Sequence, residues 1–341
     1  MTRYDKNINN LFLYWLITSL VLVFFIIIVG GLTRLTNSGL SITEWELFKG
    51  ILPPLNHETW EFYFTQYKKI PQYEILNSQM DLNEFKIIFY WEYFHRLIAR
   101  IIGLFFLIPL LFFYFSKSIK KNYINICFKI FFLIVIQGTI GWYMVRSGLI
   151  NDITVSHYRL SIHLGIAIII IASIYWIILN IMKNTNRIFF NFKTKNIFFL
   201  FLIFLIFLQI IIGAFVSGLD AGQIYQTWPL MGLNYFPNDL IFNNTKSIID
   251  FNNHSLVQFY HRNLAYFITF YILGMAIYIY NNRLMSLYSP IKLVIIFLLL
   301  QVILGIFTLL SGLNILLASA HQITSVVLVF SAINLYYIQA K

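Results

Sequence analysis

Eight long apolar runs constrain this chain more than any other feature of its sequence. They cover roughly residues 11–32, 92–115, 126–146, 157–181, 197–218, 256–280, 290–311 and 315–338. A helix needs about 20 apolar residues to cross the hydrocarbon core of a bilayer, and each run is long enough. Only 11% of the residues are charged and the mean hydropathy is +0.75, whereas soluble domains are about 25% charged. We therefore predict an all-α polytopic membrane protein with eight transmembrane helices.

The distribution of charge along the chain predicts its orientation. The basic residues concentrate near the N-terminus and around 117–129, 183–195 and 283–292, whereas Asp5 is the only one of the 13 acidic residues on that side. By the positive-inside rule, both termini are then cytoplasmic. The net charge of +11 is explained by this topology, so we expect a lipid bilayer and no nucleic acid as partner. The first run is too long for a signal peptide and no transit peptide precedes it, which favours a bacterial inner membrane.

Two long loops fall on the outer, periplasmic face in this orientation. They cover residues 33–91 and 219–255, and loops of this length are usually functional or partly folded. The only cysteine is Cys127, which excludes an intramolecular disulfide and a cysteine-ligated cluster. We therefore look for the functional groups on the outer side, among residues other than cysteine.

The sequence repeats itself. The third and seventh runs align without a gap at an offset of 164, matching Gln137, Gly141, Ser147, Gly148 and Leu149 to Gln301, Gly305, Ser311, Gly312 and Leu313. Four spans per repeat let both halves enter the membrane from the same side. We predict two parallel four-helix-bundle repeats, residues 1–182 and 183–341, and such bundles commonly hold cofactors.

Four histidines occupy matching positions in the two repeats. His95 and His261 each precede an arginine, and His163 and His321 each lie in the following outward-starting run. At 1.5 Å per residue, all four lie within roughly 10 Å of the outer boundary. A histidine inside a membrane helix is costly and usually functional, although it can also hydrogen-bond a neighbouring helix. Zinc would want a third ligand that neither half offers, so we predict two bis-histidine haem sites near the periplasmic face.

Glu92 makes the two halves unequal. It lies three residues before His95, on the same helix face, whereas the second half has Gln258 at this position. A carboxylate beside a cofactor ligand can transfer a proton or stabilise developing positive charge; alternatively, it is favoured by the dipole of a helix start. Arg96 and Arg262 each follow a candidate ligand, and they either bind haem propionates or extend to the interface. We expect a chemical site in the first half and an accessory site in the second.

The chain resembles the haem A synthase family of the proteobacterial and mitochondrial type. The resemblance rests on Gly30–Ser41 (GGLTRLTNSGLS), Glu92–Arg96 (EYFHR), His157–Leu164 (HYRLSIHL), Phe259–Arg262 (FYHR) and the His321 segment, which follow in order over nearly the whole chain. It implies an oxidoreductase that converts the C8 methyl group of haem O into a formyl group, giving haem A for cytochrome oxidase. Two successive hydroxylations with water-derived oxygen are followed by loss of water.

The resemblance also implies a role for each histidine pair. His261 and His321 would bind the iron of a haem b cofactor, His95 and His163 the iron of the substrate haem, and Glu92 would assist the chemistry. Some bacterial members carry a cysteine pair in the first outer loop. This chain lacks that pair, so its electrons must leave by another route, which we expect to be the accessory haem.

Two further expectations concern partners and alternatives. By pathway logic, haem O comes from haem O synthase, the protohaem farnesyltransferase, and the electron acceptor is a separate molecule. A di-haem cytochrome b that only transfers electrons also fits paired histidines, although it needs no carboxylate at one haem. A non-catalytic haem carrier fits parallel repeats, but the short inner loops argue against it.

Overall fold

The computed structural model describes residues 3–45, 49–151, 153–241 and 245–340. Within these ranges the chain is nearly all helical, and its only β pairing is an isolated bridge between Met231 and Asn234. Eight helices of the described chain are long and apolar enough to cross a membrane. The predicted all-α membrane class is therefore confirmed, whereas the two-repeat arrangement remains a prediction.

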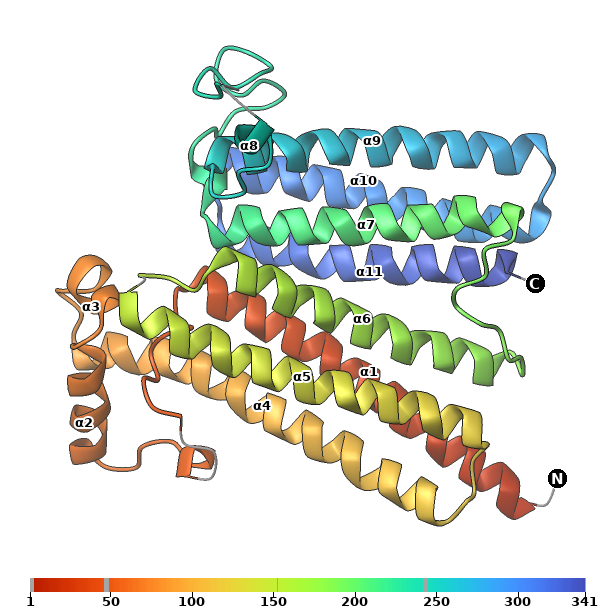
Figure 1. Ribbon diagram of the computed structural model, residues 1–341, viewed down its shortest axis with the longest axis horizontal. Helices are drawn as coiled ribbons and strands as arrows, with labels where there is room; N and C mark the ends of the chain where they lie inside the picture. Colours follow the sequence, from red (N-terminus) through yellow and green to blue (C-terminus); the bar gives the residue numbers. More distant parts are fainter. Residues whose placement is uncertain (1–2, 46–48, 152, 242–244, 341) are drawn as a thin grey trace. The chain divides into compact units, whose positions relative to one another are not determined.

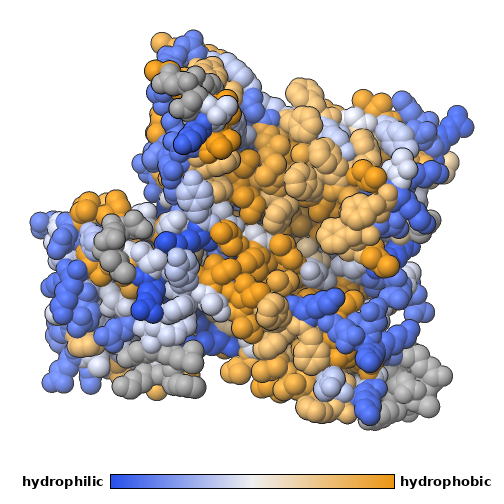
Figure 2. Space-filling model, in the orientation of Figure 1, coloured by the Kyte–Doolittle hydropathy of each residue, from blue (hydrophilic) through white to orange (hydrophobic). Residues whose placement is uncertain are grey.

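The eight long helices follow the predicted runs closely. They are α1 (Arg3–Leu35), α4 (Leu82–Phe115), α5 (Lys121–Asn151), α6 (His157–Met182), α7 (Thr194–Gly218), α9 (His254–Asn281), α10 (Tyr288–Leu310) and α11 (Ile315–Gln339) (Figure 1). The connections contain the short helices α2 (His57–Tyr67), α3 (Pro71–Leu76) and α8 (Thr245–Ile248) and the 3-10 turns η1 (Lys49–Ile51), η2 (Ala221–Gln223) and η3 (Met285–Leu287). Hydrophobic surface lies along the long helices, and hydrophilic surface gathers toward their ends (Figure 2).

Helix α4 begins ten residues earlier than the predicted span. The side chain of Asp81 accepts a hydrogen bond from the backbone of Glu84 at 2.8 Å, and Glu84 accepts one from the backbone of Asp81 at 3.1 Å. This capping box starts the helix in a polar segment that hydropathy does not mark. The predicted loop 33–91 is therefore shorter. Glu92 lies well inside the helix, so its interpretation as a helix-start carboxylate is wrong.

The chain divides into two compact units, Met1–Ile174 and Tyr175–Lys341. In the first unit, α4 packs against α1 and α5. In the second, α7 packs against α9 and α11, and α10 packs against the same two helices. The division falls inside α6, and the boundary predicted between residues 182 and 183 remains a prediction.

The first outer loop is a folded subdomain with its own aromatic core. Trp60 and Phe64 of α2 are buried, and their rings lie 5.0 Å from those of Phe89 and Phe85 on α4. Aromatic pairs at this spacing add to the free energy gained from burial alone. The subdomain therefore rests on the first turns of α4, at the end of the helix that also carries Glu92.

Candidate functional site

Each predicted ligand histidine lies against a glycine of a neighbouring helix. In the first unit, a Cβ built on Gly30 of α1 would lie 2.9 Å from Cε1 of His95 on α4. Likewise, a Cβ on Gly141 of α5 would lie 3.1 Å from Cε1 of His163 on α6. A side chain at either position would push against the imidazole, so glycine sets how closely the ring approaches the next helix.

The same contact occurs twice in the second unit. A Cβ on Gly213 of α7 would lie 3.0 Å from Cε1 of His261 on α9, and one on Gly305 of α10 would lie 2.9 Å from Cε1 of His321 on α11. The contact thus recurs in both units, and the two-repeat arrangement stays a prediction. Gly213 was missed in the sequence analysis, although Gln209 and Gly213 have the same spacing as Gln137 and Gly141.

The structure brings the histidines together in the two predicted pairs. His95 lies within electrostatic range of His163, and His261 lies within that range of His321. All four residues are half-buried. In three of them, Nδ1 is buried and has no hydrogen-bond partner, namely in His95, His163 and His261. The accessible edge of each of these rings therefore lies away from Nδ1.

In three of the four cases, a glutamine lies four residues before the glycine and contacts the histidine that packs on that glycine. The side chain of Gln137 donates to the carbonyl of His163 at 3.0 Å, and that of Gln209 donates to the carbonyl of His261 at 2.9 Å. The corresponding position before Gly30 is Ile26. The spacing Gln-x-x-x-Gly, present on three helices, is the sequence signal that could have pointed to Gln209.

Gln301 contacts both ring nitrogens of His321. Its side-chain nitrogen lies 3.3 Å from Nε2 of His321, and its backbone carbonyl lies 3.0 Å from Nδ1. The hydroxyl of Thr324 donates to Oε1 of Gln301 at 2.5 Å and so fixes the orientation of the amide. The contact between Nδ1 and the carbonyl is of the kind that orients a ligating imidazole, and Nε2 would exchange the Gln301 amide for iron on binding.

Glu92 is buried and accepts four hydrogen bonds. The hydroxyl of Ser41 and the backbone N–H of Ile42 each donate to Oε2 at 2.8 Å. Arg96 donates to Oε1 from Nε at 3.0 Å and from Nη2. With 2% of its surface exposed, the carboxylate is held by both the outer loop and its own helix.

Arg96 completes this clamp on the outer loop. Its Nη2 also donates to the carbonyl of Ile42 at 2.9 Å, and its guanidinium lies 5.4 Å from the ring centre of Trp45. Its donors thus point to protein groups of the loop and to Glu92. The binding of a haem propionate by Arg96 stays a prediction.

The second unit has a similar clamp without the carboxylate. The side chain of Gln258 donates to the carbonyl of Tyr225 at 3.0 Å, and Arg262 donates to the same carbonyl at 2.8 Å. Arg262 also donates to the carbonyl of Thr227 at 2.8 Å. Oε1 of Gln258 is buried and unpartnered. The clamp is therefore common to both units, and the negative charge is confined to the first.

The donor set fits a porphyrin better than a bare metal ion. Among the described residues, no group of three or more histidine, cysteine, aspartate or glutamate side chains could hold a metal. Each unit instead offers two imidazoles. A haem would need no more than two ligands from the protein, and each histidine pair would supply them.

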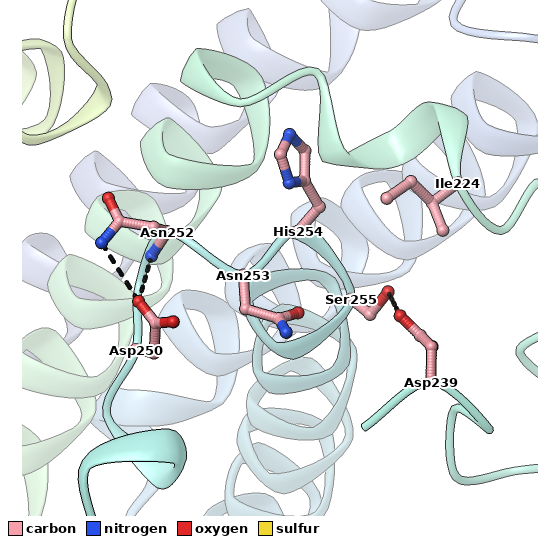
Figure 3. A pocket seen from close by; sticks show the side chains of 7 residues that line it. All are labelled: Ile224, Asp239, Asp250, Asn252, Asn253, His254 and Ser255. Carbon is pink, nitrogen blue, oxygen red and sulfur yellow. Dashed lines mark hydrogen bonds between the residues drawn. The ribbon is translucent and has the colours of Figure 1, made fainter. Parts of the chain in front are cut away.

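One cavity is lined by none of the paired histidines. It measures about 330 Å³ and is lined by Ile224, Asp239, Asp250, Asn252, Asn253, His254 and Ser255 (Figure 3). Its carboxylates are already bonded, because Ser255 donates to Asp239 at 2.6 Å and Asn252 donates to Asp250 at 3.1 Å. These contacts hold the second outer loop to the start of α9, and we assign the cavity no chemistry.

Fold and site together define an integral membrane protein with eight long helices and one histidine pair in each of two units. The chain belongs to the family described as cytochrome oxidase assembly protein, whose model matches residues 13–333. It is similar to the haem A synthase of Pelagibacter ubique strain HTCC1062, with 50% identity over 328 residues and 95% of each chain covered. The haem A synthases of Rickettsia bellii strain OSU 85-389 and Flavobacterium johnsoniae are 41% and 40% identical, with at least 93% of each chain covered.

Proposed function

We propose that this chain is a haem A synthase, an oxidoreductase that converts the C8 methyl group of haem O into a formyl group. The observation that carries the proposal is the asymmetry between two otherwise similar histidine pairs. Both pairs have glycine contacts and a clamped outer loop, but a buried carboxylate accompanies only the first. Relatives named haem A synthase cover nearly the whole chain, so both pairs fall within the matched region.

We assign the reacting haem to the first pair. His95 and His163 bind its iron, and their glycine contacts fix the direction of each ring. Glu92 already accepts four hydrogen bonds, so it acts best as a fixed negative charge. A charge held in place in this way stabilises positive charge that develops on the substrate without reorganising during the reaction.

The proposed oxidation consumes water and releases electrons. The first hydroxylation replaces one C–H bond of the methyl group by C–OH, and the second gives a geminal diol. The diol loses water to form the formyl group. In sum, the methyl group and one water give the formyl group, four protons and four electrons, and the electrons pass to an external acceptor.

We assign the resident haem b to His261 and His321. A bound haem b supplies one-electron transfer between the reacting haem and the acceptor. The carbonyl of Gln301 holds Nδ1 of His321 and so supports ligation through Nε2, which would exchange the Gln301 side chain for iron. In the clamp of the second unit, Arg262 and Gln258 hold the loop, and no charge is needed there because no bond is made or broken.

The setting of the reaction follows from the topology. We place the protein in a bacterial inner membrane, with cytoplasmic termini and both pairs near the periplasmic face. Haem O reaches it from the haem O synthase that makes this substrate, and the product serves cytochrome oxidase. The eight apolar helices and the family of oxidase assembly proteins support this placement.

Extraction of haems from the purified protein tests the proposal. The protein is produced in a host that makes haem O but not haem A, and its haems are separated by chromatography. We expect haem b together with haem O, hydroxylated intermediates and haem A. Haem b alone, with no haem A above background, would instead favour the di-haem cytochrome b. His261→Ala or His321→Ala should remove the tightly bound haem b.

A further inference from the structure

His321 differs from the other three candidate ligands in the hydrogen bonding of its ring. Its Nδ1 lies 3.0 Å from the backbone carbonyl of Gln301, whereas Nδ1 of each of the other three has no hydrogen-bond partner among the described residues. Yet all four rings lie against a glycine in the same way. Packing on glycine therefore does not account for the bond, and another group must turn the ring of His321 toward the carbonyl.

The directions of the hydrogen bonds around His321 determine one another. A carbonyl only accepts, so Nδ1 carries the proton and Nε2 of the neutral ring is an acceptor. The side-chain nitrogen of Gln301, 3.3 Å from Nε2, therefore donates to it. Oε1 of Gln301 then faces Thr324, whose hydroxyl lies 2.5 Å away and must donate, because two acceptors without a proton between them would repel. The carbonyls of Ala320 and His321 lie farther from this hydroxyl, at 2.9 and 3.1 Å.

The hydroxyl of Thr324 distinguishes this site from two similar ones. Three residues after His163 and His261, the sequence has Ile166 and Leu264, which carry no hydroxyl. The glutamines at these sites donate to the backbone carbonyls of the two histidines at 3.0 and 2.9 Å, and their amide oxygens are buried without a partner. At His261 the amide nitrogen also lies 3.4 Å from Nε2, but Nδ1 stays unpartnered. The nearby hydroxyl is thus what accompanies a ring turned onto the carbonyl.

We propose that Thr324 positions His321, through the side chain of Gln301, as the fixed ligand that retains the resident haem. This inference rests on the proposed function, which gives one pair a haem that exchanges and the other a haem that stays. When iron binds at Nε2, the Gln301 amide leaves that nitrogen, and the bond from Nδ1 to the carbonyl remains. Such a bond orients a ligand imidazole and raises its basicity. Neither histidine of the first pair has it, which suits a substrate that must leave as product.

The experiment measures how firmly the full-length protein holds its haem b. Thr324→Val removes the hydroxyl at nearly constant size, and Thr324→Ser keeps it. The control is Thr269→Val on α9, because Thr269 is also half-buried and donates to a carbonyl of its own helix, that of Ala265, at 2.8 Å. Haem transfer from each purified protein to excess apomyoglobin gives the rate of loss. Redox titration gives the midpoint potential of the bound haem.

We expect Thr324→Val to lose haem b roughly tenfold faster than the wild type, the effect of losing a hydrogen bond that supports a ligand imidazole. Its midpoint potential should rise, because a less basic imidazole stabilises ferric iron less. Thr324→Ser and Thr269→Val should match the wild type. Gln301→Leu should match Thr324→Val, and the double variant should lose haem no faster than Gln301→Leu, because the hydroxyl acts through the amide.

Four results would overturn the inference. Thr324→Val could keep the wild-type rate and potential, or it could lose haem faster at an unchanged potential, which would show only looser packing. Equal weakening in Thr324→Ser or Thr269→Val would show a general effect of substitution in these helices. A double variant much weaker than Gln301→Leu would show that the hydroxyl does not act through the amide. None of these measurements needs turnover, so they decide the inference even if the protein forms no haem A and thereby contradicts the proposed function.

Discussion

At the scale of single residues, the distinctive feature is the contact between histidine and glycine. A ligand imidazole has two soft torsions, and a helix surface without a Cβ lets the Cε1 edge of the ring approach the backbone. All four candidate ligands have this contact. The glycines therefore act on ring orientation, although none of them can touch an iron.

Substituting these glycines should displace the rings. Gly305→Ala places a Cβ 2.9 Å from Cε1 of His321, and overpacking of this kind costs about 1–3 kcal/mol. We expect less haem b per protein and a lower Tm. Gly30→Ala should instead weaken binding of haem O, because it displaces His95.

Gly274→Ala on α9 and Gly103→Ala on α4 are the matched controls. Nothing lies within 4 Å of a Cβ at either position, and alanine favours a helix by about 1 kcal/mol over glycine. Both controls should keep their haem, and their Tm should stay the same or rise slightly. If Gly305→Ala retained as much haem b as Gly274→Ala, ring contact would have no part in binding.

Glu92→Gln tests whether the first site needs charge or only shape. It gives the first unit the side chain that the second unit has at Gln258. We expect haem b to be retained and haem A formation to fall roughly 10²-fold, the effect of removing one preorganised electrostatic contact. Chromatography of extracted haems measures both quantities.

The reverse change, Gln258→Glu, is the control for Glu92→Gln. It places a carboxylate beside the accessory pair, where we propose that no bond is made. The first site keeps Glu92, so haem A formation there should be unchanged. If Glu92→Gln formed as much haem A as the wild type, the charge of Glu92 would have no part in the reaction, and its role would be limited to holding the outer loop.

The sequence predicted the four candidate ligand histidines but not the residues that hydrogen-bond to Glu92. His95, His163, His261 and His321 stand out because histidines are costly in apolar runs. The donors to Glu92 were not predictable, because the hydroxyl of Ser41 and the N–H of Ile42 reach it only after a loop of unknown path has folded.

At the scale of elements, each outer loop is tied to the helix that carries a candidate ligand. Tyr93 of α4 donates to the carbonyl of Ile51 at 2.6 Å, and Arg100 donates to that of Gly50 at 3.2 Å. Hydropathy predicted where α4 is apolar, but the capping box at Asp81 decides where it begins. This is why the span was predicted well and the loop was predicted too long.

The second outer loop should loosen in acid through Asp239. Burial alone raises the pKa of this carboxyl, but hydrogen bonds from Ser255 at 2.6 Å and Tyr225 at 2.5 Å hold the pKa below its ordinary value. The folded loop thus releases its proton more readily than the unfolded loop. Its stabilising effect is complete above the ordinary pKa of about 4 and is lost as pH falls further.

Hydrogen exchange of residues 224–240 as a function of pH measures this effect. We expect exchange protection in this loop to drop below about pH 4, where aspartate begins to protonate. Asp239→Asn should show the weaker protection at every pH. A loop that stays equally protected in acid, or an Asp239→Asn variant that keeps the wild-type pH profile, would contradict the assignment.

At the scale of the whole molecule, the predicted topology determines which side of the membrane each loop faces. Both clamped loops and all four histidines belong to the same predicted face, whereas the basic connections belong to the other. The sequence alone carries this information, because the positive-inside rule needs only loop lengths and charges. The pairing of the histidines was predicted as well, whereas the glycine contacts and the donors to Glu92 needed the structure.

Cysteine labelling tests the topology directly. The only native cysteine, Cys127, is buried, so maleimide labelling should come from the introduced cysteine alone. Ser78→Cys lies in the exposed first outer loop, and Asn186→Cys lies in the exposed connection between α6 and α7. A membrane-impermeant maleimide should label the first in intact cells and the second only after permeabilisation. The opposite pattern would invert the protein in the membrane.

The order of the glycine contacts along the chain also has a consequence for biosynthesis. The pair His95 and His163, with Gly30 and Gly141, is complete once α6 has left the ribosome and entered the bilayer. The other pair needs His321 on α11, the last helix of the described residues. Under the proposed assignment, a nascent chain that stalls before α11 would hold both ligands of the reacting haem but only His261 of the two proposed for the resident haem.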